Sequence, residues 1–194
     1  MTIQFQQVSS LAEFDFDVLF DASFPGFDKN FPWHLTFSGT TPTHQQKKDF
    51  YVSQLTLGIS NNLPFKKENE QLLMFKVTLD GKEVMFKGGY IENDGITHRG
   101  HWFLTDTDLT GSRKWMYTEE FDTAQRNFYA QFGITHHKVL TYVGSDLYKM
   151  MRSRTYYVQN QSLSNRAEVI NETIDNDIPN VIGFPKFVVM TVKL

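Results

Sequence analysis

The sequence predicts a mixed α/β fold in which a mostly antiparallel sheet is flanked by helices. Apolar residues first alternate with polar ones, then recur with helical spacing, and then alternate again through a long central segment, 71–105. Beyond that segment helical and strand patterns follow each other, an order typical of mixed sheets. Neither an internal repeat nor a linker-like tract interrupts the 194 residues. We therefore expect one domain, 1–194.

A short strand and two helices are expected at the start of the chain. Residues 1–7 alternate between apolar and polar side chains, which predicts the strand. A helix follows, from a serine cap at position 9 or 10 to about Ala22, where a Pro-Gly pair signals a turn. Thr43 caps a second helix, which ends at Gly58 or at the Asn-Asn pair beyond it.

The central segment predicts a meander of three antiparallel strands. Asp80-Gly81 is a strong hairpin signal between two apolar runs, and a second turn is predicted at 93–95 (Asn-Asp-Gly). These turns divide the segment into the strands Gln71–Leu79, Lys82–Glu92 and Ile96–Thr105.

Helices and strands alternate in the last part of the chain. A helix is predicted over 112–132, where Gly133 ends it, and a short buried strand over 138–143. Ser145 caps a further helix with the sequence DLYKMMRSR. Two more strands are expected near 168–171 and 187–194.

The composition excludes several classes of function. A formal net charge of −3 lacks the basic excess of nucleic-acid binders, so no nucleic acid is expected as a partner. No apolar run is long enough to cross a membrane, and the first residues do not form a signal peptide. The absence of cysteine excludes disulfides, thiolate nucleophiles and cysteine-ligated metals. These features indicate a cytoplasmic protein.

The order of elements resembles that of the GNAT N-acyltransferase superfamily over nearly the whole chain. The resemblance implies that the fourth and fifth strands splay apart and that an acyl-CoA thioester, such as acetyl-CoA, lies between them. It also implies that the CoA pyrophosphate rests on the N-terminus of the helix after the fourth strand, where unpaired N–H groups favour an anion. An amine acceptor would then attack the thioester carbonyl directly.

The resemblance places the cofactor-binding residues around the entry to that helix. The family's phosphate loop has an Arg or Gln, two further residues, a Gly, any residue, and then Gly or Ala. This chain instead has Thr-Gly-Ser-Arg-Lys at 110–114, with one glycine and no leading Arg or Gln. The alternative is a helix N-cap followed by an exposed basic turn. The predicted cofactor-binding residues are Thr105, Gly111, Ser112, Arg113 and Lys114.

The predicted catalytic residues are Tyr148, His101 and Glu92. By resemblance Tyr148 is the general acid that protonates the departing thiolate, although the alternative is a tyrosine that packs on the sheet. A carboxylate or imidazole near the acyl carbon can take the proton of the attacking amine, which makes Glu92 and His101 candidates. His98 is a third candidate, but it lies three residues from His101 and must face the other side of the strand. No metal site is expected, because neither Asp106 with Asp108 nor the pair 136–137 has ligand spacing.

Two functions from different classes follow from these observations. The first is an acyl-CoA-dependent N-acyltransferase with an unidentified amine acceptor. The second is a GNAT-like protein without catalysis, used as a structural or interaction module of the kind found in viral and phage proteins. The incomplete phosphate loop and a surplus of aromatic residues (18 Phe, 8 Tyr and 3 Trp) favour the second, and a homodimer or another protein partner is left open.

Overall fold

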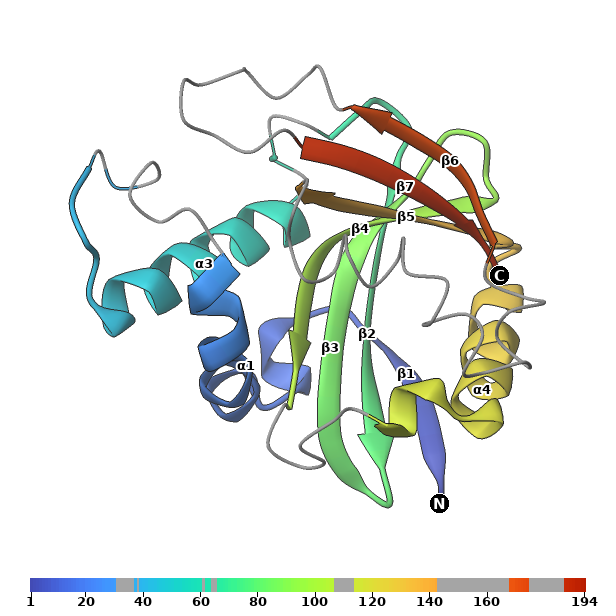
Figure 1. Cartoon of the computed structure of the whole chain (residues 1–194), viewed down its shortest axis with the longest axis horizontal. Coiled ribbons are helices and arrows are strands. Elements are labelled where there is room, and N and C mark those ends of the chain that lie inside the picture. Colours follow the sequence, from blue (N-terminus) through green and yellow to red (C-terminus); the bar gives the residue numbers. More distant parts are fainter. Residues whose placement is uncertain are drawn as a thin grey trace.

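In the computed structural model one mixed sheet forms the centre of the molecule (Figure 1). The structure describes residues 1–30, 37, 39–60, 62–63, 66–106, 114–142, 168–174 and 187–194. Within this part of the chain seven strands hydrogen-bond in the order β1-β2-β3-β4-β5-β7-β6. They are β1 (Ile3–Val8), β2 (Gln71–Leu79), β3 (Lys82–Ile91), β4 (Thr97–Thr105), β5 (His136–Tyr142), β6 (Glu168–Ile174) and β7 (Phe187–Lys193).

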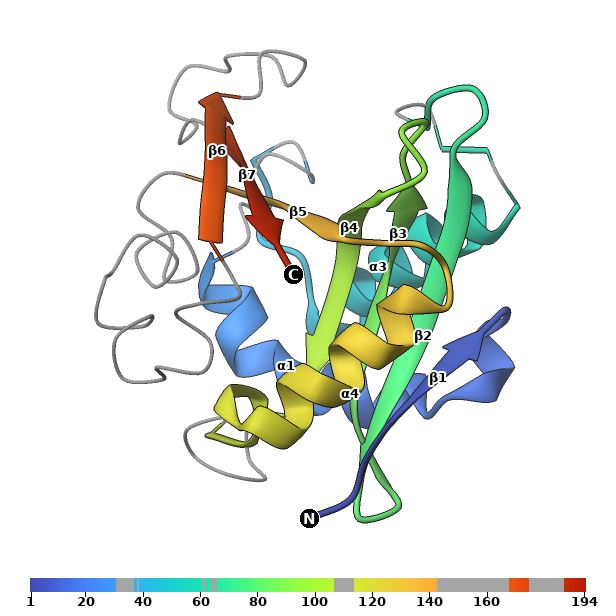
Figure 2. The same ribbon diagram turned by 90° about the vertical axis from the view of Figure 1, so that its right-hand side faces the viewer.

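Helices cover both faces of the sheet (Figure 2). Helices α1 (Phe16–Asn30) and α3 (His44–Ile59) pack on one face, and α4 (Glu119–Ala130) packs on the other. Each face has its own apolar core, and about half of the buried residues in each are aromatic. The core under α1 and α3 includes Phe14, Phe20, Phe86 and Trp102, and the core under α4 includes Phe75, Phe121, Phe128 and Tyr129. Much of the aromatic surplus is therefore used for packing.

The predicted meander is confirmed. Strands β2, β3 and β4 pair antiparallel, and Asp80-Gly81 adopts positive φ at both positions, as a tight hairpin requires. In the second turn the Asp94 carboxylate accepts hydrogen bonds from the N–H groups of Ile96 and Thr97, so that β4 begins at Thr97.

Strands β4 and β5 pair in parallel and then diverge, which confirms the expected splay. Their pairing covers only Thr97–Gly100 against 136–139, although β4 continues to Thr105 and β5 to Tyr142. We call the unpaired continuation of the two strands the splay, and the level of Gly100 and Val139 its vertex. All other neighbouring strands in the described sheet are antiparallel, as predicted.

Two predictions about the first helices need correction, and one is confirmed. The carboxylate of Glu13 binds Ser9 and Ser10, which gives a short 3₁₀ turn (Leu11–Glu13), and α1 begins only at Phe16. Helix α1 also continues past the predicted end at Ala22 and runs to Asn30. It does so because Phe20 and Phe24 pack against His44 of α3. Helix α3 begins with the predicted Thr43 cap, whose side chain accepts from Gln46 N–H in a capping box.

The helix predicted over 112–132 is shorter than expected. A separate 3₁₀ turn (Lys114–Tyr117) comes first, and α4 begins at Glu119, because the Thr118 side chain caps it by accepting from Phe121 N–H. Strand β5 begins two residues earlier than predicted, at His136. The helix expected after Ser145 lies outside the described residues, whereas β6 and β7 lie where strands were expected.

Candidate functional site

The backbone of β4 along the splay is hydrogen-bonded to side chains from α1 and α3. The N–H of Asp106 points to β3, where it donates to Val84 O, so the N–H groups of Phe103 and Thr105 point away from β3. Phe103 N–H donates to Tyr51 Oη at 3.1 Å, and Thr105 N–H donates to Ser23 Oγ at 2.6 Å. The Ser23 hydroxyl in turn donates to Thr105 O at 2.9 Å. Two hydroxyls therefore occupy the donors that β5 leaves unpaired.

Tyr51 and Thr105 are both deeply buried at this edge. Their side chains are 6% and 2% exposed, and burial raises the pKa of the Tyr51 phenol, which stays neutral. Thr105, a predicted cofactor-binding residue, therefore lies in the splay but binds Ser23 through its backbone. The sequence did not indicate this role for Tyr51, because helical periodicity places the ring in the core and says nothing of its hydroxyl.

The first turn of α4, which follows the predicted phosphate loop in the sequence, carries negative charge. It holds Glu119, Glu120 and Asp122, which already complement the helix dipole. Asp122 also forms an ion pair with Arg126 at 2.7 Å. Of the predicted phosphate-binding residues, Lys114 lies in the 3₁₀ turn before α4, and 111–113 (Gly, Ser, Arg) lie outside the described residues.

An ion-pair network joins the two predicted general bases. Arg99 binds Glu70 at 2.5 Å, donates to His101 Nε2 at 2.9 Å and lies 3.4 Å from Glu92. Glu92 also pairs with Lys138 of β5. Burial, together with the Arg99 charge, lowers the pKa of His101 to about 3. His101 is therefore neutral at neutral pH, and its Nε2 lone pair accepts from a guanidinium that can only donate.

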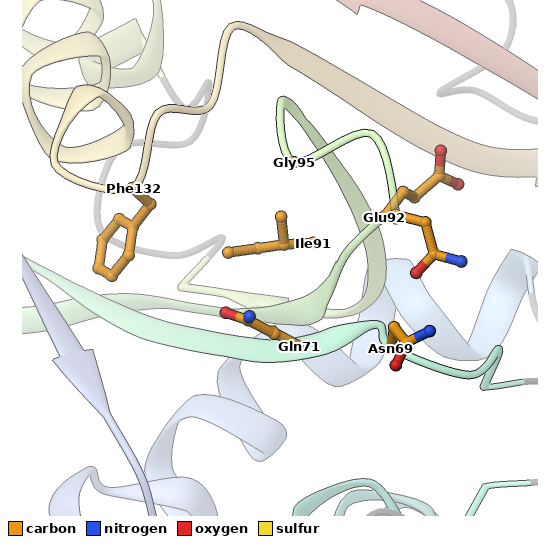
Figure 3. Close-up of a pocket in the computed structure, with 7 residues that line it drawn as sticks. Asn69, Gln71, Ile91, Glu92, Gly95 and Phe132 are labelled. Atoms are coloured by element: carbon orange, nitrogen blue, oxygen red, sulfur yellow. The ribbon is translucent and has the colours of Figure 1, made fainter.

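Glu92 also lines a polar pocket of about 470 Å³ (Figure 3). The pocket lies where β2 begins, β3 ends and α4 has just ended. Amide side chains and one carboxylate make up its polar part, and two apolar side chains face them. The lining residues are Asn69, Gln71, Ile91, Glu92, Asn93, Gly95 and Phe132.

The two histidines of β4 lie on opposite sides of the sheet, as the alternation of side chains along a strand predicts. His98 points to the α4 side, where it contacts Phe75 and Tyr129, whereas His101 contacts Tyr90 and Trp102 on the opposite side. Tyr148, the predicted general acid, lies outside the described residues. Among the described residues no group of three or more His, Asp or Glu side chains could hold a metal ion.

Comparison with known proteins identifies the fold. The chain aligns over 100% of its length with 95% of an acetyl transferase from Salmonella typhimurium that modifies the N-terminal serine of ribosomal protein L7/L12, at 10% identity and a TM-score of 0.55. It aligns over 98% of its length with 94% of a ribosomal L7/L12 alpha-N-protein acetyltransferase in complex with coenzyme A, at 10% identity and a TM-score of 0.54. The chain has the GNAT fold.

The likeness to these proteins is one of fold and not of amino-acid sequence. No protein-family model matches the sequence, and no curated protein matches it. The described helices include none that is long and apolar enough to cross a bilayer. The likeness therefore lies in the order and pairing of the elements, the parallel β4–β5 pair included.

Proposed function

We propose that the chain is an N-acyltransferase that moves an acyl group from an acyl-CoA thioester, such as acetyl-CoA, to an amine. The observation that supports this proposal is the β4–β5 splay, which begins at Gly100 and Val139 within a GNAT fold. A protein with the same fold was solved in complex with coenzyme A. In this reaction the amine nitrogen attacks the thioester carbonyl carbon, the C–S bond breaks, and the thiolate receives a proton.

The residues of this chain take the following parts in the proposal. The donor lies along the splay, and its carbonyl accepts from Phe103 N–H once the Tyr51 hydroxyl has moved away. Charge that develops on the carbonyl oxygen is stabilised there by a fixed backbone donor. Tyr148 supplies the proton for the thiolate, and either Glu92 or His101 receives the proton of the amine after Arg99 has shifted. The segment from Gly111 to Lys114 contacts the CoA phosphates, with two cationic side chains to offset the acidic first turn of α4.

Thermal unfolding with coenzyme A and acetyl-CoA tests the proposal. A ligand at 100 times its dissociation constant stabilises the folded state by about 2.7 kcal/mol. For a chain of this length we expect a rise in Tm of roughly 5–10 °C. Replacing both Arg113 and Lys114 with Ser should reduce that rise, and adenosine alone should not produce it. A Tm that stays constant up to millimolar coenzyme A contradicts the proposal.

A second candidate is a GNAT-like interaction module without catalysis. The observations that favour it are the occupied N–H groups of Phe103 and Thr105 and the acidic first turn of α4. Phe103, whose side chain is 40% exposed on β4, would then belong to a surface for a second copy or another protein. The same thermal unfolding experiment separates the two candidates, because coenzyme A should not change the Tm of an interaction module that does not bind it. Sedimentation of the free chain over a range of concentrations then tests for self-association.

A further inference from the structure

Three basic side chains and a phenol meet on the α4 side of the sheet at the vertex of the splay. Lys87 comes from β3, His98 from β4, His137 from β5 and Tyr129 from α4, and we call these four residues the vertex cluster. His98 and His137 are register partners across the parallel pair, and their ring centroids lie 5.6 Å apart. The cluster thus joins four elements at the level where β4 and β5 separate.

Gly100 provides the room in which Lys87 and His137 approach each other. A Cβ atom added at Gly100 would lie 3.2 Å from His137 Nε2 and 3.6 Å from Lys87 Cε. Both side chains therefore lean over the same point of β4 from its two neighbouring strands. A larger residue at this position would fill the space between the imidazole and the amine.

The vertex cluster has more hydrogen-bonding groups than partners. His98 Nδ1 shares a hydrogen bond with Tyr129 Oη at 3.0 Å. The Nε2 atom of His137, a residue that is only 8% exposed, has no hydrogen-bond partner among the described residues. Lys87 Nζ lies 5.9 Å from the centre of the Tyr129 ring, and no hydrogen bond or ion pair joins it to another described residue. A buried polar group without a hydrogen-bond partner raises the free energy of the folded state. A ligand that hydrogen-bonds to such a group removes this cost, which favours binding.

Among the described residues, the vertex cluster also lacks the counter-charge that three half-buried cations elsewhere in the sheet have. Arg99 pairs with Glu70, Lys76 with Glu83, and Lys138 with Glu92. No acidic side chain of the described part perturbs Lys87, and burial alone lowers its pKa to about 7.

The same environment keeps both histidines of the cluster neutral. Burial, followed by the Lys87 charge, holds the pKa of His98 and of His137 well below the usual range, while the Leu73 carbonyl opposes this effect at His98. A bound anion would favour the protonated form of Lys87 and would accept hydrogen bonds from the N–H groups of the imidazoles.

We propose that Lys87 and His137 bind a carboxylate at the far end of the donor's acyl group. The donor is then a thioester of a dicarboxylic acid, with one carboxyl joined to sulfur and the other free. This inference rests on the proposed function. In that arrangement the CoA phosphates lie toward the start of α4, at the end of the sheet where β4 ends, so the acyl group extends along the splay toward the vertex (Figure 2). A single carboxylate matches the single charge that Lys87 can carry.

Isothermal titration of the full chain with coenzyme A, butyryl-CoA and succinyl-CoA at pH 7 tests the proposal. The two esters have the same carbon chain and differ by the free carboxylate. We expect succinyl-CoA to bind at least about tenfold more tightly than butyryl-CoA, since bonds to charged groups contribute more than neutral ones. Lys87→Met and His137→Phe should each reduce this preference. Lys67→Met, which removes an equal charge from an exposed position before β2, should keep it.

Each outcome bears on a different claim. Equal affinity for the two esters in the unaltered chain overturns the carboxylate site and leaves the acyltransferase proposal intact. Failure of coenzyme A and of both esters to bind overturns the proposed function and, with it, this inference. The donor comparison uses the unaltered chain, so it decides the question even if a variant fails to fold.

Discussion

At the scale of single residues, the Tyr51 hydroxyl occupies one backbone donor of β4, the N–H of Phe103. Tyr51→Phe removes the acceptor of Phe103 N–H and leaves the ring in the core. An internal hydrogen bond contributes about 0.5–1.5 kcal/mol, so the variant should bind coenzyme A thioesters roughly 2–10-fold more tightly if the donor uses the same N–H. The same change should lower the free energy of unfolding by about 1 kcal/mol. Titration calorimetry and urea unfolding measure the two effects.

Tyr90→Phe is the matched control for Tyr51→Phe. Tyr90 lies in the same core, and its buried hydroxyl has no hydrogen-bond partner in the described part of the chain, so its removal should leave donor affinity unchanged and not destabilise the fold. Unchanged affinity in Tyr51→Phe as well would show that the donor does not use Phe103 N–H.

At this scale the sequence predicted which side of a strand a side chain faces, but it predicted few of the hydrogen-bond and ion-pair partners. Strand parity correctly separated His98 from His101. It could not reveal Lys87, because a lysine between apolar strand residues has the pattern of a solvent-facing position, and the side chain is half-buried only because α4 packs beside it. The contact between Tyr51 and Phe103 spans 52 residues and likewise depends on the tertiary structure.

At the scale of elements, Gly58 allows α3 to pack closely against Trp102 of β4. A Cβ atom at Gly58 would lie 2.3 Å from the ring of Trp102, far inside van der Waals contact. Gly58→Ala should therefore lower the free energy of unfolding by about 1–3 kcal/mol through overpacking. This loss would occur despite the higher helix propensity of alanine. Urea unfolding followed by circular dichroism gives the value.

Ser53→Ala on the exposed face of α3 is the control for Gly58→Ala. It makes the helix-favouring change without a steric clash and should alter stability by less than about 0.5 kcal/mol. A stabilised Gly58→Ala variant would show that α3 does not approach Trp102 as closely as the structure indicates.

Elements with strong local signals were predicted well, and those that depend on distant contacts were not. The Asp-Gly and Asn-Asp-Gly turns have positive φ built into their residues, so the three strands of the meander were placed almost to the residue. The end of α1 was wrong because its packing on α3 and β4 outweighs a local Pro-Gly signal. The start of α4 was wrong because the Thr118 side chain caps the helix by accepting from Phe121 N–H, so α4 begins at Glu119.

At the scale of the whole molecule, buried bases should make the fold more stable at higher pH. His98, His101 and His137 have a pKa below 6.5 in the folded state, so below pH 6.5 the unfolded chain binds protons that the folded chain does not. Stability is therefore lost as pH falls below about 6.5. Lys87 affects stability at higher pH, because the pKa of its amine is 10.5 in the unfolded chain and about 7 in the folded chain. Between these values the unfolded chain again holds the extra proton, and stability rises with pH.

We expect the free energy of unfolding to rise from pH 7 to pH 9 by at most about 1.4 kcal/mol per pH unit from Lys87. Urea unfolding at several pH values measures this slope, and the Lys87→Met variant should flatten it above pH 7. Below pH 6.5 the variant should still lose stability, because the three histidines are intact. A slope that persists in Lys87→Met would assign the alkaline gain to other groups. A flat profile in both proteins would mean that Lys87 is solvated. In that case the vertex cluster would lack the buried amine on which carboxylate binding depends.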